Sequence, residues 1–196
     1  MSRMSGAVLL TLGLSGAMLV GLGGCAAPGS PAERSTVQFR PVLATISQVG
    51  ADPLTEDELE PLGQLDCEAL ATPLDPPAAE PVTACDDDGE GYLLGPAELD
   101  DGDLAAVSAS PPPKGATQGW GVLVVLDADG TARFADLTAR LLTHPAGDPR
   151  NRLALVLDGR VISAPFINAA ITEGQMLISG SFTEESAKRL ARQLGG

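Results

Sequence analysis

A stretch near the C-terminal end, LALVLDGRVIS at residues 153–163, constrains the fold more tightly than any other part of the chain. Residues 153–157 are a continuous apolar run, and residues 160–163 resume with β-branched side chains. Between them stands Asp158-Gly159, a dipeptide preferred in two-residue type I′ turns because both turn positions need a left-handed backbone. The pattern therefore predicts a β-hairpin.

Regular elements are also expected on both sides of this hairpin. Residues 120–126 are a buried-strand run, and residues 131–142 place apolar side chains on one helical face before Pro145 stops the helix. Residues 175–178 form a further strand. Thr183 then caps a helix whose apolar residues recur at the helical spacing i, i+3, i+4, i+7, namely Ala187, Leu190, Ala191 and Leu194.

The order β-α-β-β-β-α predicts an α+β domain over residues 120–196, a ferredoxin-like sheet with two helices on one face. Residues 39–119 are an acidic, loop-rich lead-in, because proline and glycine are frequent from Asp66 onward. Short strands are expected there at 91–94 and 104–108. These short strands are expected to form a small, loop-rich region beside the α+β domain.

The first residues resemble a bacterial lipoprotein signal. Residues 1–24 carry one charge, Arg3, and a glycine-interrupted apolar stretch ends in Gly23-Gly24 directly before Cys25. Small residues before a cysteine suit a signal peptidase, so residues 1–24 are expected to be a signal peptide and Cys25 the lipidated residue. The alternative is an uncleaved membrane anchor, for which the stretch is short and rich in glycine. Residues 25–38 have the composition of a flexible tether.

The two other cysteines, Cys67 and Cys85, make an even number in a chain expected to be exported. Export favours a disulfide between them, because oxidising compartments preserve such bonds. Two unpaired thiols are the alternative. There is no CxxC or Cys/His cluster to suggest a metal site.

The chain is strongly acidic, with a formal net charge of −14 that becomes −15 if Arg3 is removed with the signal peptide. Such a charge argues against binding of nucleic acid, and it leaves the N-terminal lipid to attach the chain to an anionic membrane. Residues 86–90, DDDGE, could be a calcium loop. Their spacing is not that of an EF-hand, which favours a solvated turn.

The sequence offers little for enzyme chemistry. His144 is the only histidine and lies between a helix end and Pro145, where a C-terminal cation near the helix dipole explains it. Ser163 has no identifiable base, and no nucleophile elbow or phosphate loop is present. We expect a non-catalytic protein without a cofactor.

The hairpin and several other segments, in the same order, resemble the head part of the first periplasmic domain of SecD/SecDF, a membrane protein that assists polypeptide export. These segments are FRPVL at 39–43, YLLGPA at 92–97 and FADLT at 134–138, and the cysteine pair falls where actinobacterial members tend to have one. The resemblance covers residue 39 to the C-terminus. It implies the head fold, an extracytoplasmic position and contact with emerging polypeptides or translocon components (SecDF or SecYEG).

The membrane helices with which that family conducts protons have no counterpart in this sequence apart from the signal. We therefore expect a passive binder at the outer face of the cell membrane, or one that joins a partner supplying the motor. Three apolar residues, Phe166, Ile167 and Met176, are candidates for holding extended polypeptide by strand addition at a sheet edge. Ordinary core packing is the alternative for each of them.

The competing hypothesis is an envelope interaction or structural lipoprotein that reuses the fold without a role in export. Its motivation is the missing membrane bundle together with the long acidic lead-in. A shared fold does not imply a shared function, so both hypotheses are open at this point.

Overall fold

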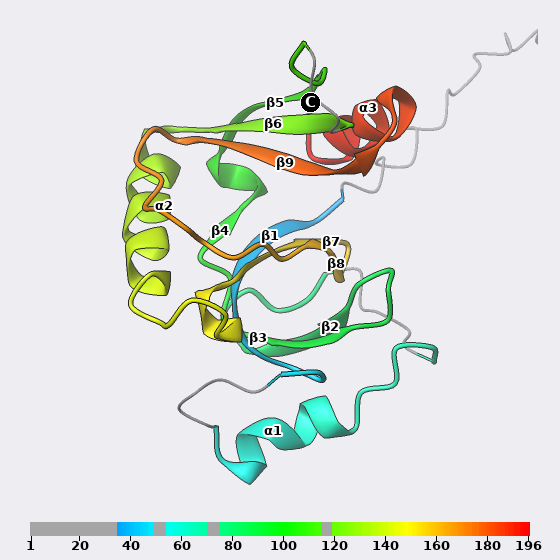
Figure 1. The fold of residues 1–196 in the computed structure, drawn as a ribbon, viewed down its shortest axis with the longest axis vertical. Coiled ribbons are helices and arrows are strands. Elements are labelled where there is room, and N and C mark those ends of the chain that lie inside the picture. The colour runs from blue at the N-terminus through cyan, green and yellow to red at the C-terminus, as the bar shows by residue number, and fades with distance from the viewer. Residues whose placement is uncertain (1–34, 49–53, 70–74, 115–118) are drawn as a thin grey trace, which may run out of the picture. The chain divides into compact units, whose positions relative to one another are not determined.

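A computed structural model of the chain describes residues 35–48, 54–69, 75–114 and 119–196. All of them belong to one compact unit, Arg34–Gly196. This unit contains two antiparallel sheets and three α-helices within the described ranges (Figure 1). The expected α+β class is confirmed.

The larger sheet is organised around strand β1, Val37–Thr45. Its first half pairs with β7, Leu153–Leu157, and with the short β4, Leu99–Asp100. Its second half pairs with β3, Gly91–Leu94, with a register shift between Val42 and Ala44. Strands β2, Val82–Cys85, and β8, Arg160–Ser163, complete the strand order β2-β3-β1-β7-β8.

The smaller sheet has the order β5-β6-β9. It consists of β5, Leu104–Ser110, β6, Trp120–Leu126, and β9, Gln175–Phe182. Both sheets combine strands from before and after residue 120, since β1 pairs with β7 and β5 pairs with β6. The segments 39–119 and 120–196 therefore share their sheets.

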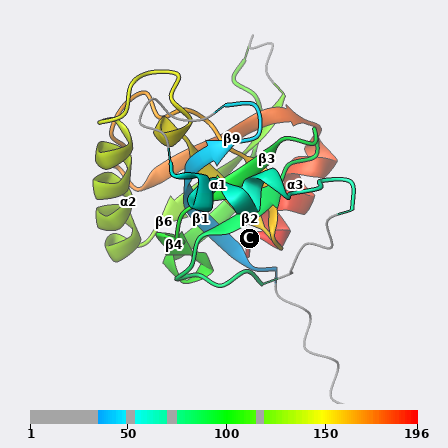
Figure 2. The same cartoon turned by 90° about the horizontal axis from the view of Figure 1, so that it is seen from below.

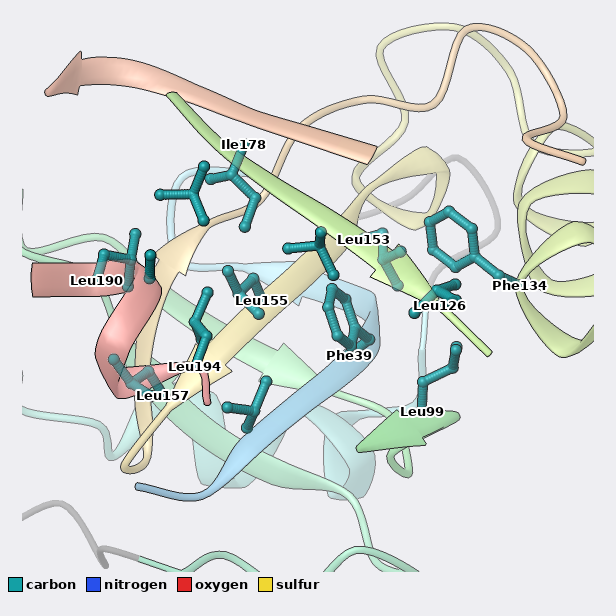
Figure 3. Close-up of a cluster of buried hydrophobic side chains, with 14 of the residues drawn as sticks. Phe39, Leu99, Leu126, Phe134, Leu153, Leu155, Leu157, Ile178, Leu190 and Leu194 are labelled. Carbon is teal, nitrogen blue, oxygen red and sulfur yellow. The ribbon is translucent and has the colours of Figure 1, made fainter. Parts of the chain in front are cut away.

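The main hydrophobic core lies between the two sheets, where Figure 3 shows Leu155 of β7 and Ile178 of β9 among its members. Strand β7 is buried along its whole length. Leu153, Leu155 and Leu157 face this main core, whereas Ala154 and Val156 face a second core shared with β1, β3 and β8. A strand with two apolar faces needs a layer on each side.

This double burial explains why the strands occupy two sheets rather than the single sheet expected from their order. The hairpin β7–β8 enters the middle layer, while β6 and β9, its neighbours in sequence, pair with each other in the upper layer (Figure 1). Alternation of apolar residues does not reveal which of several apolar strands will be buried on both faces.

The two C-terminal helices pack into the same main core against one face of the smaller sheet, as expected, and they lie at opposite ends of that face (Figure 1). Helix α2, Ala128–Leu141, follows β6, and α3, Glu184–Gln193, follows β9. Because β6 and β9 are antiparallel, their C-terminal ends lie at opposite ends of the sheet. Helix α2 therefore begins at one end of the smaller sheet, and α3 begins at the other end.

A third helix, α1, Glu56–Gly63, packs Leu62 against Leu93 of β3 and Ala44 of β1 in a small separate cluster. Figure 1 shows α1 beneath the β2–β3 layer, and Figure 2 shows α2 and α3 on opposite flanks. Thr55 and Glu58 form a capping box at the start of α1, which satisfies backbone N–H groups that the first helical turn leaves unpaired.

The local predictions agree closely with the structure. The turn residues Asp158 and Gly159 have φ angles of 49° and 79°, as a type I′ turn requires. Thr183 caps α3 and accepts a hydrogen bond from the N–H of Ser186. Asp127 likewise caps α2 through the N–H of Gly130. The hairpin and the start of α3 are thus confirmed, whereas α2 begins three residues before the predicted Thr131.

Candidate functional site

An apolar cavity of about 500 Å³ opens beside strand β9. The segment after β8 forms one wall, β9 forms the other, and core residues of β1, α2 and β7 form the floor. None of the side chains that line the cavity carries a charge. Its size lies within the range of ordinary ligand sites, and its lining suits apolar groups.

The three residues proposed for polypeptide binding all line this cavity. Ile167 is only 7% exposed and belongs to the main core, and Met176 is half-buried against the same core. Phe166 is 42% exposed. Core packing thus accounts for much of the burial of Ile167 and Met176, whereas Phe166 remains accessible.

Leu177 is an accessible apolar residue that the sequence did not single out. It is 53% exposed and belongs to the stretch of β9 that borders the cavity. The strand pattern holds the available signal, because side chains alternate along β9 and buried Ile178 places its neighbour Leu177 on the opposite face.

The free edge of β9 borders this cavity. Within the described residues β9 pairs with β6 alone. The N–H of Leu126 donates to the C=O of Gly174, and in the same register Met176 and Ile178 lie opposite Val124 and Val122. In an antiparallel pair, every second residue points its backbone groups at the partner strand.

The residues between them therefore point the other way. The backbone N–H and C=O groups of Gln175, Leu177 and Ser179 are directed toward the open edge. Such a row of unpaired groups is the ordinary template for adding an extended chain to a sheet. The arrangement combines a hydrogen-bonding edge with an apolar cavity beside it.

Behind Phe166 lies Arg152, whose guanidinium carbon is 5.3 Å from the ring centre of Phe166 and 5.3 Å from that of Tyr92. The Tyr92 hydroxyl donates to the Asp86 carboxylate at 2.8 Å. Burial, and then this hydrogen bond, raise the pKa of Tyr92 to about 12, although the positive charge of Arg152 acts in the opposite direction. The phenol is therefore neutral at physiological pH.

The acidic turn at residues 86–90 adjoins this group. One oxygen of Asp86 accepts the N–H groups of Asp88 and Glu90, and the other accepts the Tyr92 hydroxyl. Both oxygens of the Asp86 carboxylate thus have hydrogen-bond donors within a solvated turn. No group of three or more metal-ligating side chains occurs within the ranges that the structure describes.

The expected disulfide joins Cys67 to Cys85, with the two Cα atoms 5.7 Å apart. It connects the segment after α1 to the end of β2. Cys25, the expected lipidation site, lies outside the described residues. Across the four described ranges, no helix is long and apolar enough to cross a membrane.

The residues considered for catalysis are not brought together as an active site. Ser163 lines the cavity, whereas His144 does not. The backbone N–H of His144 donates to the C=O of Leu141 at the end of α2.

Known proteins provide an independent comparison. The chain is 35% identical to the protein translocase subunit SecD of Streptomyces coelicolor over 119 residues, which are 59% of this chain and 20% of that protein. It is 47% identical to SecD of Desulfurispirillum indicum over 70 residues, 36% of this chain and 12% of that protein. The chain thus spans about a fifth or less of the length of these curated relatives.

Among solved structures, the chain is similar to a crystal structure of SecDF in a super-membrane-facing form, with a TM-score of 0.49 and 30% identity over 82% of this chain and 18% of that one. A structure of SecDF described as a membrane component that enhances protein export gives a TM-score of 0.48 and 28% identity, covering 82% of this chain and 62% of that one. The family model of the SecDF P1 head subdomain matches residues 79–196. Since that match covers more than half of the chain, the chain belongs to the SecDF P1 head subdomain family.

Proposed function

We propose that this chain is a non-catalytic, extracytoplasmic module that holds extended segments of polypeptides during protein export. The observation that carries the proposal is the free edge of β9 beside an uncharged apolar cavity. Membership of the SecDF P1 head subdomain family supports a role in export, and a lipid on Cys25 would keep the module at the membrane.

The bound segment adds to β9 as a further strand. Its backbone forms hydrogen bonds with the outward groups of Gln175, Leu177 and Ser179. These bonds contribute affinity that does not depend on the side chains of the bound segment. Side chains alternate in a strand, so every second one enters the cavity past Phe166 and Met176. The others lie on the outer face, beside Leu177.

This geometry defines the class of client. Segments with apolar residues at alternate positions fit best, because the cavity lining contains no charge to pair with a buried ionic group. Folded proteins are excluded, since their backbone groups are already paired.

Two substitutions at one position test the strand-addition step. Leu177→Pro removes the outward N–H without removing a bond to β6, and proline is tolerated on an edge strand when its nitrogen faces away from the sheet. Leu177→Ala removes the side chain but keeps the N–H. Binding of a fluorescently labelled, reduced and alkylated polypeptide is measured for both by anisotropy. We expect a larger loss of affinity for the proline variant.

Ile46→Ala is the matched control, because Ile46 is 54% exposed, close to the 53% of Leu177, but does not line the cavity. Amide exchange by NMR gives the second readout. The client should slow exchange at Gln175, Leu177 and Ser179 and leave Met176 and Ile178 nearly unchanged. Equal affinities for the proline and alanine variants, or protection without this alternation, would refute strand addition.

The role in export is tested in intact cells by crosslinking through the full-length protein, followed by mass spectrometry of what is recovered with it. Translocon subunits such as SecDF or SecYEG, or precursor chains, are the expected products. Recovery of envelope proteins alone would favour the competing hypothesis of an interaction or structural lipoprotein.

A further inference from the structure

The smaller sheet has an outer face that is free of charge. Helices α2 and α3 pack on its other face, because their buried residues belong to the main core, and α1 packs on the larger sheet. Strand pairing brings nine residues together on the outer face: Ala106, Ser108 and Ser110 of β5, Gly121, Leu123 and Val125 of β6, and Gln175, Leu177 and Ser179 of β9. The solvated face of an antiparallel sheet is ordinarily polar. An uncharged face in a chain of net charge −14 is therefore a candidate interaction surface.

Leu177 is the large apolar side chain of this face that is most open to solvent, with 53% of its surface exposed. Leu123 lies directly opposite it on β6. A Cβ added at Gly121 would lie 2.9 Å from Cδ1 of Leu177, so the leucine leans over the backbone of the neighbouring strand. Within the described ranges, neither leucine belongs to a buried hydrophobic cluster. Beyond Leu177 the sheet ends, because β9 is its edge strand.

The regular part of this edge is short. Residues 175–179 pair one to one with β6, and a register shift follows before Phe182. Strand β9 contains no charged residue and no proline, the two residue types that commonly protect an edge from strand addition. An added strand would have two side chains on the cavity side, opposite Met176 and Ile178. Its other three would lie on the outer face, the middle one opposite Leu177.

This middle position of the added strand differs from the two outer-face positions beside it. Those two lie opposite Gln175 and Ser179, which are polar, whereas the middle one lies opposite an exposed leucine. An apolar residue there removes apolar surface of both chains from water. It also extends the cross-strand pair of Leu123 and Leu177 by one strand, and such pairs stabilise a sheet.

We infer that Leu177 is a specificity-determining residue of the polypeptide site, which selects segments with three consecutive apolar residues over segments with two apolar residues separated by a polar one. This inference rests on the proposed function. The first and third apolar residues face the cavity, and the middle one packs on Leu177. Backbone hydrogen bonds do not distinguish one register from the next, so this side-chain contact also sets the register of the bound segment.

Two soluble peptides that differ at one residue test the selection. Both contain Thr-Val-Xaa-Val-Thr between short polar flanks, and Xaa is leucine in one peptide and threonine in the other. In fluorescence anisotropy, the wild-type protein should bind the leucine peptide about two- to fivefold more tightly, the range expected for one cross-strand apolar pair. Leu177→Thr keeps a residue that favours strands, and it should bind the two peptides about equally.

Ile46→Thr is the matched control, because Ile46 is 54% exposed and directly follows β1, outside the smaller sheet. It should keep the preference of the wild type for the leucine peptide. A preference that survives in Leu177→Thr would refute the inference and leave the proposed function standing. Failure of both peptides to bind the wild-type protein would overturn the proposed function and the inference together.

The register provides a second readout. A peptide whose leucine is moved by two positions should slide along β9 and keep that leucine beside Leu177. Intermolecular NOEs between the methyl groups of the peptide leucine and those of Leu177 detect this contact. NOEs from the peptide leucine to Met176 or Ile178 instead would place it on the cavity side and refute the inference. Alternating amide protection along β9 in the same sample would still support strand addition.

Discussion

Arg40 is fully buried, at 0% exposure, in the half of β1 that pairs with β7. Its guanidinium donates to the side chain of Gln38 and to the C=O groups of Pro77, Glu80 and Gly95. No carboxylate among the described residues forms an ion pair with it, and burial lowers the pKa of Arg40. Arg40 thus ties residues 77–80 and Gly95 to the central strand through hydrogen bonds alone.

Replacing Arg40 by methionine keeps an apolar stem but removes every donor. The bonds to Gln38 and Gly95 are buried, and each acceptor left without a partner costs about 1 to 3 kcal/mol. Relief from burying a charge and the apolar packing of methionine offset part of this cost. We expect Arg40→Met to lower the free energy of unfolding by about 3 kcal/mol.

Urea denaturation with the disulfide intact measures this loss. At a slope of about 2 kcal/mol/M, the midpoint should fall by about 1.5 M. The matched control is Arg140→Met, because Arg140 is 61% exposed and pairs with Glu98 on the surface. That change should cost less than about 1 kcal/mol. Equal midpoints for the two variants would refute the reasoning that the buried donors stabilise the fold.

Three further outcomes are expected. The disulfide is opened by reduction or by the double substitution Cys67→Ser and Cys85→Ser. Because the bond joins residues 18 apart in the sequence, its loss should lower the free energy of unfolding, measured by denaturation, by about 3 kcal/mol. Gly159→Ala should cost about 1 to 2 kcal/mol because φ is 79° there, whereas Gly63→Ala in α1, where a new Cβ meets nothing within 4 Å, should be neutral or stabilising. The folded-state pKa of Tyr92 is raised from 10.0 to about 12. The contribution of Tyr92 to the free energy of unfolding is therefore intact below pH 10 and is lost as the pH rises toward 12. Relative to Tyr92→Phe, the wild type should lose at most about 3 kcal/mol over that interval in alkaline denaturation, and parallel curves for the two proteins would contradict this.

Some elements lacked a clear signal in the sequence. Strand β1 contains Pro41 and Arg40, residue types that argue against a central strand. Helix α1 contains Pro61 and four acidic residues, so it resembles a solvated loop, although the capping box of Thr55 and Glu58 was available as a helix signal. Burial of Arg40 depends on carbonyl groups 37 to 55 residues away, which no local pattern reveals.

The sequence by itself determined the features whose causes lie within a few residues. These are the Asp158-Gly159 turn, the strands next to it, and the helix start at Thr183, because turn and cap energies depend on neighbouring backbone groups. Only the tertiary structure decided that β7 is buried on both faces, that the helices lie at opposite ends of the core, and that the segment after β8 and strand β9 border one cavity. These outcomes depend on which apolar faces, far apart in the sequence, pack against one another. The hydrophobic effect that drives this packing is non-directional, so it does not specify which of the apolar segments will meet.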